Sequence, residues 1–156
     1  MDTAGIAVNS NYAYVGVGAS TVDECAVGPM GSLTDCAPTG AGFLGVDGIS
    51  LANGYAYIAN QGSGTVSGSV SVCPVGSGGS LSPCVPSTIA PGVTPISVAV
   101  NGAQAYVNDS VIDSADDSVS NNIYLCSVGP GGALGGSCMV SNGGTTFIGA
   151  IQIAIH

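Results

Sequence analysis

Side chains able to do acid–base or nucleophilic chemistry are scarce in this chain, and they are not grouped. Its 156 residues include no Lys or Arg, nine acidic residues and one histidine. The single glutamate is Glu24, next to Cys25, and the histidine is His156. A Ser-His-Asp arrangement would have to recruit that histidine from a position where chains are usually mobile. We therefore expect that the chain is not an enzyme and carries no catalytic residue.

The densest charged cluster consists of Asp109, Asp113, Asp116 and Asp117. Carboxylates with neighbouring Ser and Asn oxygens are able to hold Ca²⁺, although this spacing fits no EF-hand or nonapeptide pattern. We favour a solvated acidic loop between two strands, with a calcium site as the alternative. We expect no other cofactor.

Two features of the sequence bear on carbohydrate. The tripeptide that starts at Asn108 matches the acceptor pattern for N-glycosylation. Tyrosines able to stack on sugars recur along the chain, at Tyr12, Tyr14, Tyr55, Tyr57 and Tyr106. Equivalent positions in every repeat more often serve packing, so we favour packing within each unit over a sugar-binding platform.

The bulk composition excludes several classes of partner. The net charge is −9, and only 6% of the residues are charged. Phosphate backbones and anionic membranes require cationic side chains, so nucleic acid and lipid headgroups are poor partners. Gly, Ser, Asn, Thr and Pro interrupt every apolar stretch, so we expect no membrane span. Little of the sequence has the apolar period of a helix, and its alternating runs predict an all-β fold.

Three copies of one pattern fill most of the chain. An apolar residue begins each copy and a tyrosine follows eight residues later, in the pairs Ile6 with Tyr14, Ile49 with Tyr57 and Val98 with Tyr106. Each copy then continues to a pair of cysteines across a Gly-rich turn, and its third and fourth strands are predicted to end at these cysteines. We predict units at residues 1–40, 41–90 and 91–142, each with four short antiparallel strands, which is the size of a β-propeller blade. Residues 143–156 are predicted to form one extra strand.

The second copy resembles a known family. Residues 48–84, GISLANGYAYIANQGSGTVSGSVSVCPVGSGGSLSPC, are similar to the repeat of the YVTN-type, lactonase-like β-propeller proteins, and most similar to secreted bacterial members with a cysteine pair in each blade. YIAN at Tyr57 stands where that family has its Tyr-Val-Thr-Asn signature. The resemblance implies propeller-type blades. It also implies that an enzyme of this family would use acidic, His and Arg side chains in a central channel. This sequence has no such residue that can be assigned to a matching position.

Six cysteines allow fifteen pairings, and the repeats favour one of them. The favoured pairs are Cys25–Cys36, Cys73–Cys84 and Cys126–Cys138. Each would close the outer hairpin of one unit, and such bonds indicate an oxidising compartment, so we expect a secreted or cell-surface protein. A metal site is the rival interpretation, but the cysteines lack its clustered spacing.

The segment that contains Ile151, Ile153 and Ile155 repeats the first strand of a unit. With no Lys to protect a sheet edge, this strand is suited to pairing with another copy of the chain. We therefore predict an extracellular structural protein that self-assembles into a filament or ring by exchange of terminal strands. The alternatives are a ligand-binding, lectin-like propeller module with a glycan as partner, or a non-catalytic fragment of a larger lactonase-like propeller.

Overall fold

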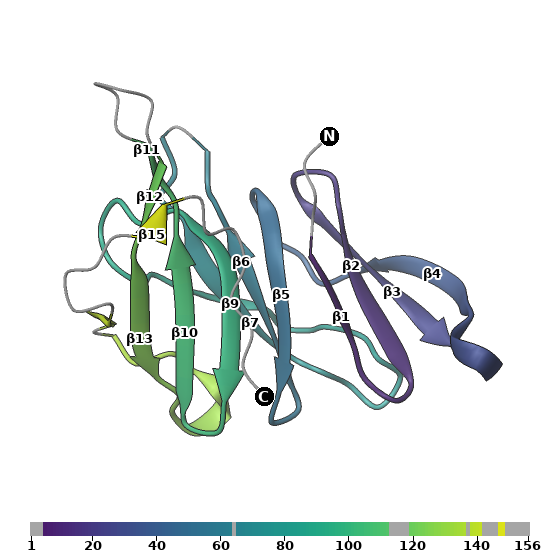
Figure 1. Ribbon diagram of the computed structural model, residues 1–156. Helices are drawn as coiled ribbons and strands as arrows, with labels where there is room; N and C mark the ends of the chain where they lie inside the picture. The colour runs from purple at the N-terminus through teal and green to yellow at the C-terminus, as the bar shows by residue number, and fades with distance from the viewer. Residues whose placement is uncertain (1–4, 64, 113–118, 137, 142–146, 149–156) are drawn as a thin grey trace.

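The computed structural model describes residues 5–63, 65–112, 119–136, 138–141 and 147–148, and it shows an all-β chain. The strands pair antiparallel into three four-stranded sheets and one three-stranded sheet. The three larger sheets follow one another along the chain and lie side by side, with the second in the middle (Figure 1). The predicted all-β class and the three groups of four antiparallel strands are confirmed.

The first sheet has the order β1-β2-β3-β4. Its strands are β1 (Ile6–Val8), β2 (Tyr12–Val17), β3 (Thr21–Val27) and β4 (Leu33–Thr39). A short 3-10 turn, η1 (Pro29–Gly31), joins β3 to β4. β1 and β4 are the two edges of this sheet.

The second sheet has the order β5-β6-β7-β8. Its strands are β5 (Val46–Ala52), β6 (Tyr55–Asn60), β7 (Ser69–Pro74) and β8 (Val85–Ser87). Asn53 and Gly54 connect β5 to β6, with φ angles of 54° and 80°. Both values lie in the left-handed region that a two-residue hairpin turn requires, which Asn-Gly supplies.

The third sheet has the order β9-β10-β13-β14. Its strands are β9 (Pro95–Asn101), β10 (Gln104–Asp109), β13 (Ile123–Ser127) and β14 (Met139–Val140). The 3-10 turn η2 (Pro130–Gly132) follows β13, as η1 follows β3.

A small fourth sheet was not expected from the sequence. It consists of β11 (Val111–Ile112), β12 (Val119–Asn121) and β15 (Phe147–Ile148). β11 and β12 lie within the segment predicted as an acidic loop, and β15 pairs with β12 of the same chain. The predicted extra strand at 143–156 is therefore used internally at Phe147–Ile148, and Ile151, Ile153 and Ile155 lie outside the described residues.

Two apolar clusters hold the large sheets together. Alternate residues of β6 point to opposite sides, so Ala56 and Ile58 pack toward the first sheet, while Tyr57 and Ala59 pack toward the third. The middle sheet is consequently buried on both faces, which explains the nearly continuous apolar sequence of β6. The packing contacts are between units, whereas packing within each unit was predicted.

The first strands of the three units lie next to one another. β5 packs against β9 and also against β1. Gly48 permits this approach, because a Cβ there would lie 2.7 Å from Cα of Ser97. In the described part of the chain, no helix is long and apolar enough to cross a membrane.

Candidate assembly surface

All six cysteines form the disulfides that the repeats predicted. Cys25–Cys36, Cys73–Cys84 and Cys126–Cys138 have Cα–Cα distances of 4.0, 4.2 and 4.4 Å. One detail of the prediction is wrong. The fourth strand was expected to end at the second cysteine, but in the second and third units it begins just after that cysteine.

The disulfides close turns that share the pattern Val-Gly-x-x-Gly-x-Leu. The leucines of this pattern are Leu33, Leu81 and Leu134. Leu81 and Leu134 are 1% and 8% exposed, because each belongs to a cluster beneath the preceding sheet. Leu33 is 44% exposed. These leucines were not among the predicted site residues, although their constant position in the pattern was the signal that could have identified them.

Tyr14 joins the first sheet to the turn of the second unit. Its buried hydroxyl donates a hydrogen bond of 2.6 Å to the carbonyl oxygen of Gly79. Burial, with a further contribution from the Glu24 carboxylate, raises the pKa of Tyr14 to about 12. The hydroxyl therefore remains protonated and able to donate over the physiological pH range.

The equivalent Tyr57 provides a matched comparison. Its hydroxyl is buried and has no hydrogen-bond partner among the described residues. Tyr14→Phe should lower the free energy of unfolding by about 1 kcal/mol, since it removes a hydrogen bond, whereas Tyr57→Phe should be close to neutral. Urea unfolding followed by circular dichroism measures both. Equal losses in the two variants would contradict the role assigned to the Tyr14 hydroxyl.

The rings of Tyr12 and Tyr55 are also covered by turns. A Cβ on Gly79 would lie 2.7 Å from the Tyr12 ring, and one on Gly132 would lie 2.8 Å from the Tyr55 ring. These close approaches leave little of either ring face for a sugar. A hollow of about 320 Å³ beside Tyr55 is lined mostly by apolar residues, including Val72 and Val85. Tyr12, Tyr14, Tyr55 and Tyr57 thus serve packing, as favoured, but they do so between sheets.

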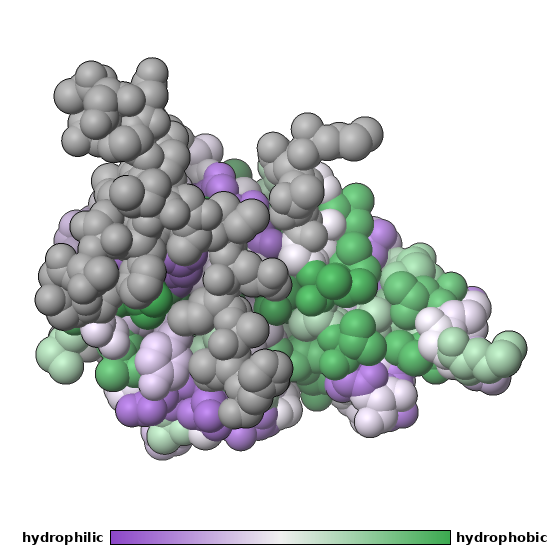
Figure 2. Space-filling model, in the orientation of Figure 1, coloured by the Kyte–Doolittle hydropathy of each residue, from purple (hydrophilic) through white to green (hydrophobic). Residues whose placement is uncertain are grey.

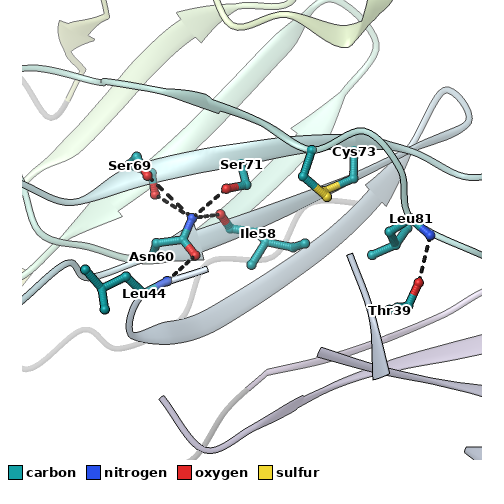
Figure 3. The surroundings of a disulfide bond; sticks show 9 residues. Thr39, Leu44, Ile58, Asn60, Ser69, Ser71, Cys73 and Leu81 are labelled. Atoms are coloured by element: carbon teal, nitrogen blue, oxygen red, sulfur yellow. Dashed lines mark hydrogen bonds between the residues drawn. A yellow bond between two sulfur atoms is a disulfide. The ribbon is translucent and has the colours of Figure 1, made fainter. Parts of the chain in front are cut away.

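Asn60, the last residue of the YIAN motif, is buried and hydrogen-bonds to the residues around it (Figure 3). Its Nδ2 group donates to the Ile58 carbonyl at 3.1 Å and to the Ser71 hydroxyl at 3.0 Å. Its Oδ1 atom accepts from the Leu44 amide at 3.4 Å. A buried amide with several partners orders the surrounding backbone, so this signature residue fixes the loop that leads into β5.

Asp109 occupies the position of Asn60 in the third unit. It lies at the end of β10 and is 2% exposed, and its Oδ1 atom accepts a hydrogen bond of 2.7 Å from the Thr94 amide. Burial raises the pKa of this carboxyl group, although hydrogen bonds from the Thr94 and Ser110 backbones partly oppose the rise. The expected solvated acid is thus a buried structural residue at this position.

Substituting Asp109 with Asn tests this assignment. A raised pKa means that the stabilisation by Asp109 is complete below the ordinary carboxyl pKa and is lost as the pH rises through the raised value. Asp109→Asn keeps the acceptor and carries no charge, so it should raise the free energy of unfolding at pH 7 by on the order of 1 kcal/mol. It should also flatten the dependence of stability on pH. Asp35→Asn, at an exposed position, is the control for net charge. A loss of stability in Asp109→Asn at pH 7 would contradict the assignment.

Other predicted site residues do not come together. Asp113, Asp116 and Asp117 lie outside the described residues, and no group of three potential metal ligands exists among the residues that are described. Asn108, the residue that matches the glycosylation pattern, is buried in β10. His156 is also outside the described ranges.

The outer face of the first sheet is apolar and exposed. This face points away from the second sheet and carries Ile6, Val8, Val17 and Leu33, which are 58%, 56%, 46% and 44% exposed. Figure 2 shows the corresponding hydrophobic surface over the first sheet, on the right of the view. Exposed apolar patches of this kind are typical of surfaces that contact another molecule. We call it the leucine face of the first sheet.

Comparisons with family models, with curated proteins and with solved structures find no match to this chain.

Proposed function

We propose that this chain is an extracellular structural protein that assembles with copies of itself into a ring or filament. The exposed leucine face of the first sheet is the observation that carries this proposal. Water contact with several large apolar side chains on one sheet is unfavourable, and association would remove it.

Several further features support the proposal. Three disulfides fit an oxidising compartment and stiffen units that contain few bulky residues. β1 is a sheet edge without a charged side chain, and the chain has no Lys with which to discourage pairing. In this proposal the three sheets are propeller-type blades, and the segment with Ile151, Ile153 and Ile155 pairs with a strand edge of another copy.

Head-to-tail contacts of this kind close into a ring where the rotation permits and otherwise extend as a filament. Electron microscopy of the protein purified without reducing agent tests the proposal. We expect rings or fibres. Single small particles at every protein concentration would exclude a self-assembling structural role.

A further inference from the structure

The contact between neighbouring sheets is built in the same way twice within the chain. One sheet contributes the face that carries Tyr14 in the first sheet and Tyr57 in the second, which we call its tyrosine face. The next sheet contributes its leucine face. That face comprises Ala56, Ile58, Cys73 and Leu81 in the second sheet, and Ala105, Val107, Cys126 and Leu134 in the third.

Among the described residues, no other sheet covers the leucine face of the first sheet. Residues at the equivalent sequence positions are Ala13, Val15, Cys25 and Leu33, of which the small Ala13 and Cys25 are buried and Leu33 is exposed. The Gly-rich turns differ in the same way as the leucines, since a preceding sheet covers the turns of the second and third units and not that of the first. A Cβ on Gly79 or Gly132 would collide with a tyrosine of the preceding sheet, whereas one on Gly31 would meet no atom within 4 Å. The backbone of the three turns is alike, with φ angles of 86°, 75° and 79° at these glycines.

The third sheet has a tyrosine face that points away from the second sheet. Ala105 and Val107 of β10 pack against the second sheet, so the intervening Tyr106 lies on the opposite side. Leu125 and Met139 are in register with Tyr106 on that side, and Met139 is 68% exposed. The Tyr106 ring is half-buried, and its hydroxyl hydrogen-bonds to the exposed Gln104 at 3.2 Å.

We propose that the leucine face of the first sheet binds the tyrosine face of the third sheet of a second copy, which repeats the contact already present twice within the chain. Tyr106 would then donate to the Gly31 carbonyl of the other copy, as Tyr14 donates to Gly79, whereas Tyr57 at the second contact packs without such a bond. The inference rests on the proposed self-assembly and specifies its surfaces and its polarity. The two surfaces differ, so the contact is heterologous and each copy has one of each.

One charge lies on the leucine face of the first sheet. Asp23 is in register with Val15 and Pro38 there, and the chain has no Lys or Arg to pair with it. Burial of this carboxylate opposes association. Asp23→Asn should therefore tighten the self-association by about tenfold.

The test uses one variant to block each surface and then mixes them. Leu33→Asp disables the leucine face and leaves the tyrosine face intact, whereas Met139→Asp does the reverse. Both side chains are exposed, so each variant should fold. Val66→Asp, which alters an exposed valine away from both surfaces, is the control. Sedimentation velocity measures the assembly of each protein, and circular dichroism checks its fold.

We expect the control to assemble like the parent and each blocked variant to associate more weakly by about tenfold or more. Since each blocked variant retains the surface that the other lacks, an equal mixture should form dimers and no larger species. Tyr106→Phe should weaken the parent's assembly without unfolding the chain. If the parent assembles and both blocked variants assemble equally well, these surfaces are wrong while the proposed function stands. If the parent is monomeric, the proposed function itself fails.

Discussion

Removing the Cys73–Cys84 disulfide, with alanine at both positions, should lower the free energy of unfolding by roughly 4 kcal/mol. Closing a loop of 11 residues accounts for about 3 kcal/mol of this loss, because the bond restricts the unfolded chain. The remainder comes from packing. Cys73 is fully buried between the first and second sheets, and Cys84 packs against the same cluster. Urea unfolding under non-reducing conditions measures the loss.

The Cys25–Cys36 disulfide provides the matched control. It closes a loop of the same length, but only Cys25 is buried, Cys36 is exposed, and neither cysteine belongs to the two apolar clusters. The corresponding double alanine variant should lose only the loop-closure contribution, about 3 kcal/mol. Equal losses from the two disulfides, in monomeric protein, would show that packing under the first sheet adds nothing.

Leu81→Ala should lower the free energy of unfolding by about 3 kcal/mol, since it creates a cavity at a side chain that is 1% exposed. Leu33→Ala makes the same chemical change at the equivalent position of the first unit, where the side chain is 44% exposed. It should cost less than about 1 kcal/mol when the protein is dilute enough to be monomeric. Chemical denaturation at low concentration measures both variants.

The pair also reports on assembly. At concentrations where the parent assembles, the cost of Leu33→Ala should rise toward that of Leu81→Ala, because another copy then covers Leu33. A cost of Leu33→Ala that stays the same at all concentrations would indicate that this leucine remains in water.

Features that depend on local sequence could be predicted. The strands follow alternating apolar residues, the Asn53-Gly54 turn follows from the φ angles that these residues tolerate, and the cysteine pairing follows from the repeat. The position of Asn60 within a conspicuous motif was also visible, although its hydrogen-bond partners were not. These partners come from β7 and from the loop before β5, so they become neighbours only in the folded chain.

Features that depend on neighbouring sheets could not be predicted. The sequence pattern is the same around Leu33, Leu81 and Leu134. Only the presence or absence of a preceding sheet determines whether the leucine side chain is buried or exposed. Asp109 lies close in sequence to other acidic residues, and this clustering favoured the prediction of a solvated loop. Its burial arises because β10 extends through it and the Thr94 amide requires an acceptor. The small sheet with β15 joins segments far apart in the sequence, and two-residue strands leave little pattern to read.

The most direct test of self-assembly is the mass of the native protein in solution, measured by sedimentation equilibrium over a wide range of concentration at neutral pH without reducing agent. We expect a mass that is a multiple of the chain mass and that falls on dilution. For Leu33→Asp, which should associate more weakly by about tenfold or more, we expect the mass of one chain at concentrations where the parent is still assembled. A mass of one chain for the parent at every concentration would contradict the account, because the leucine face of the first sheet would then remain exposed in the native protein.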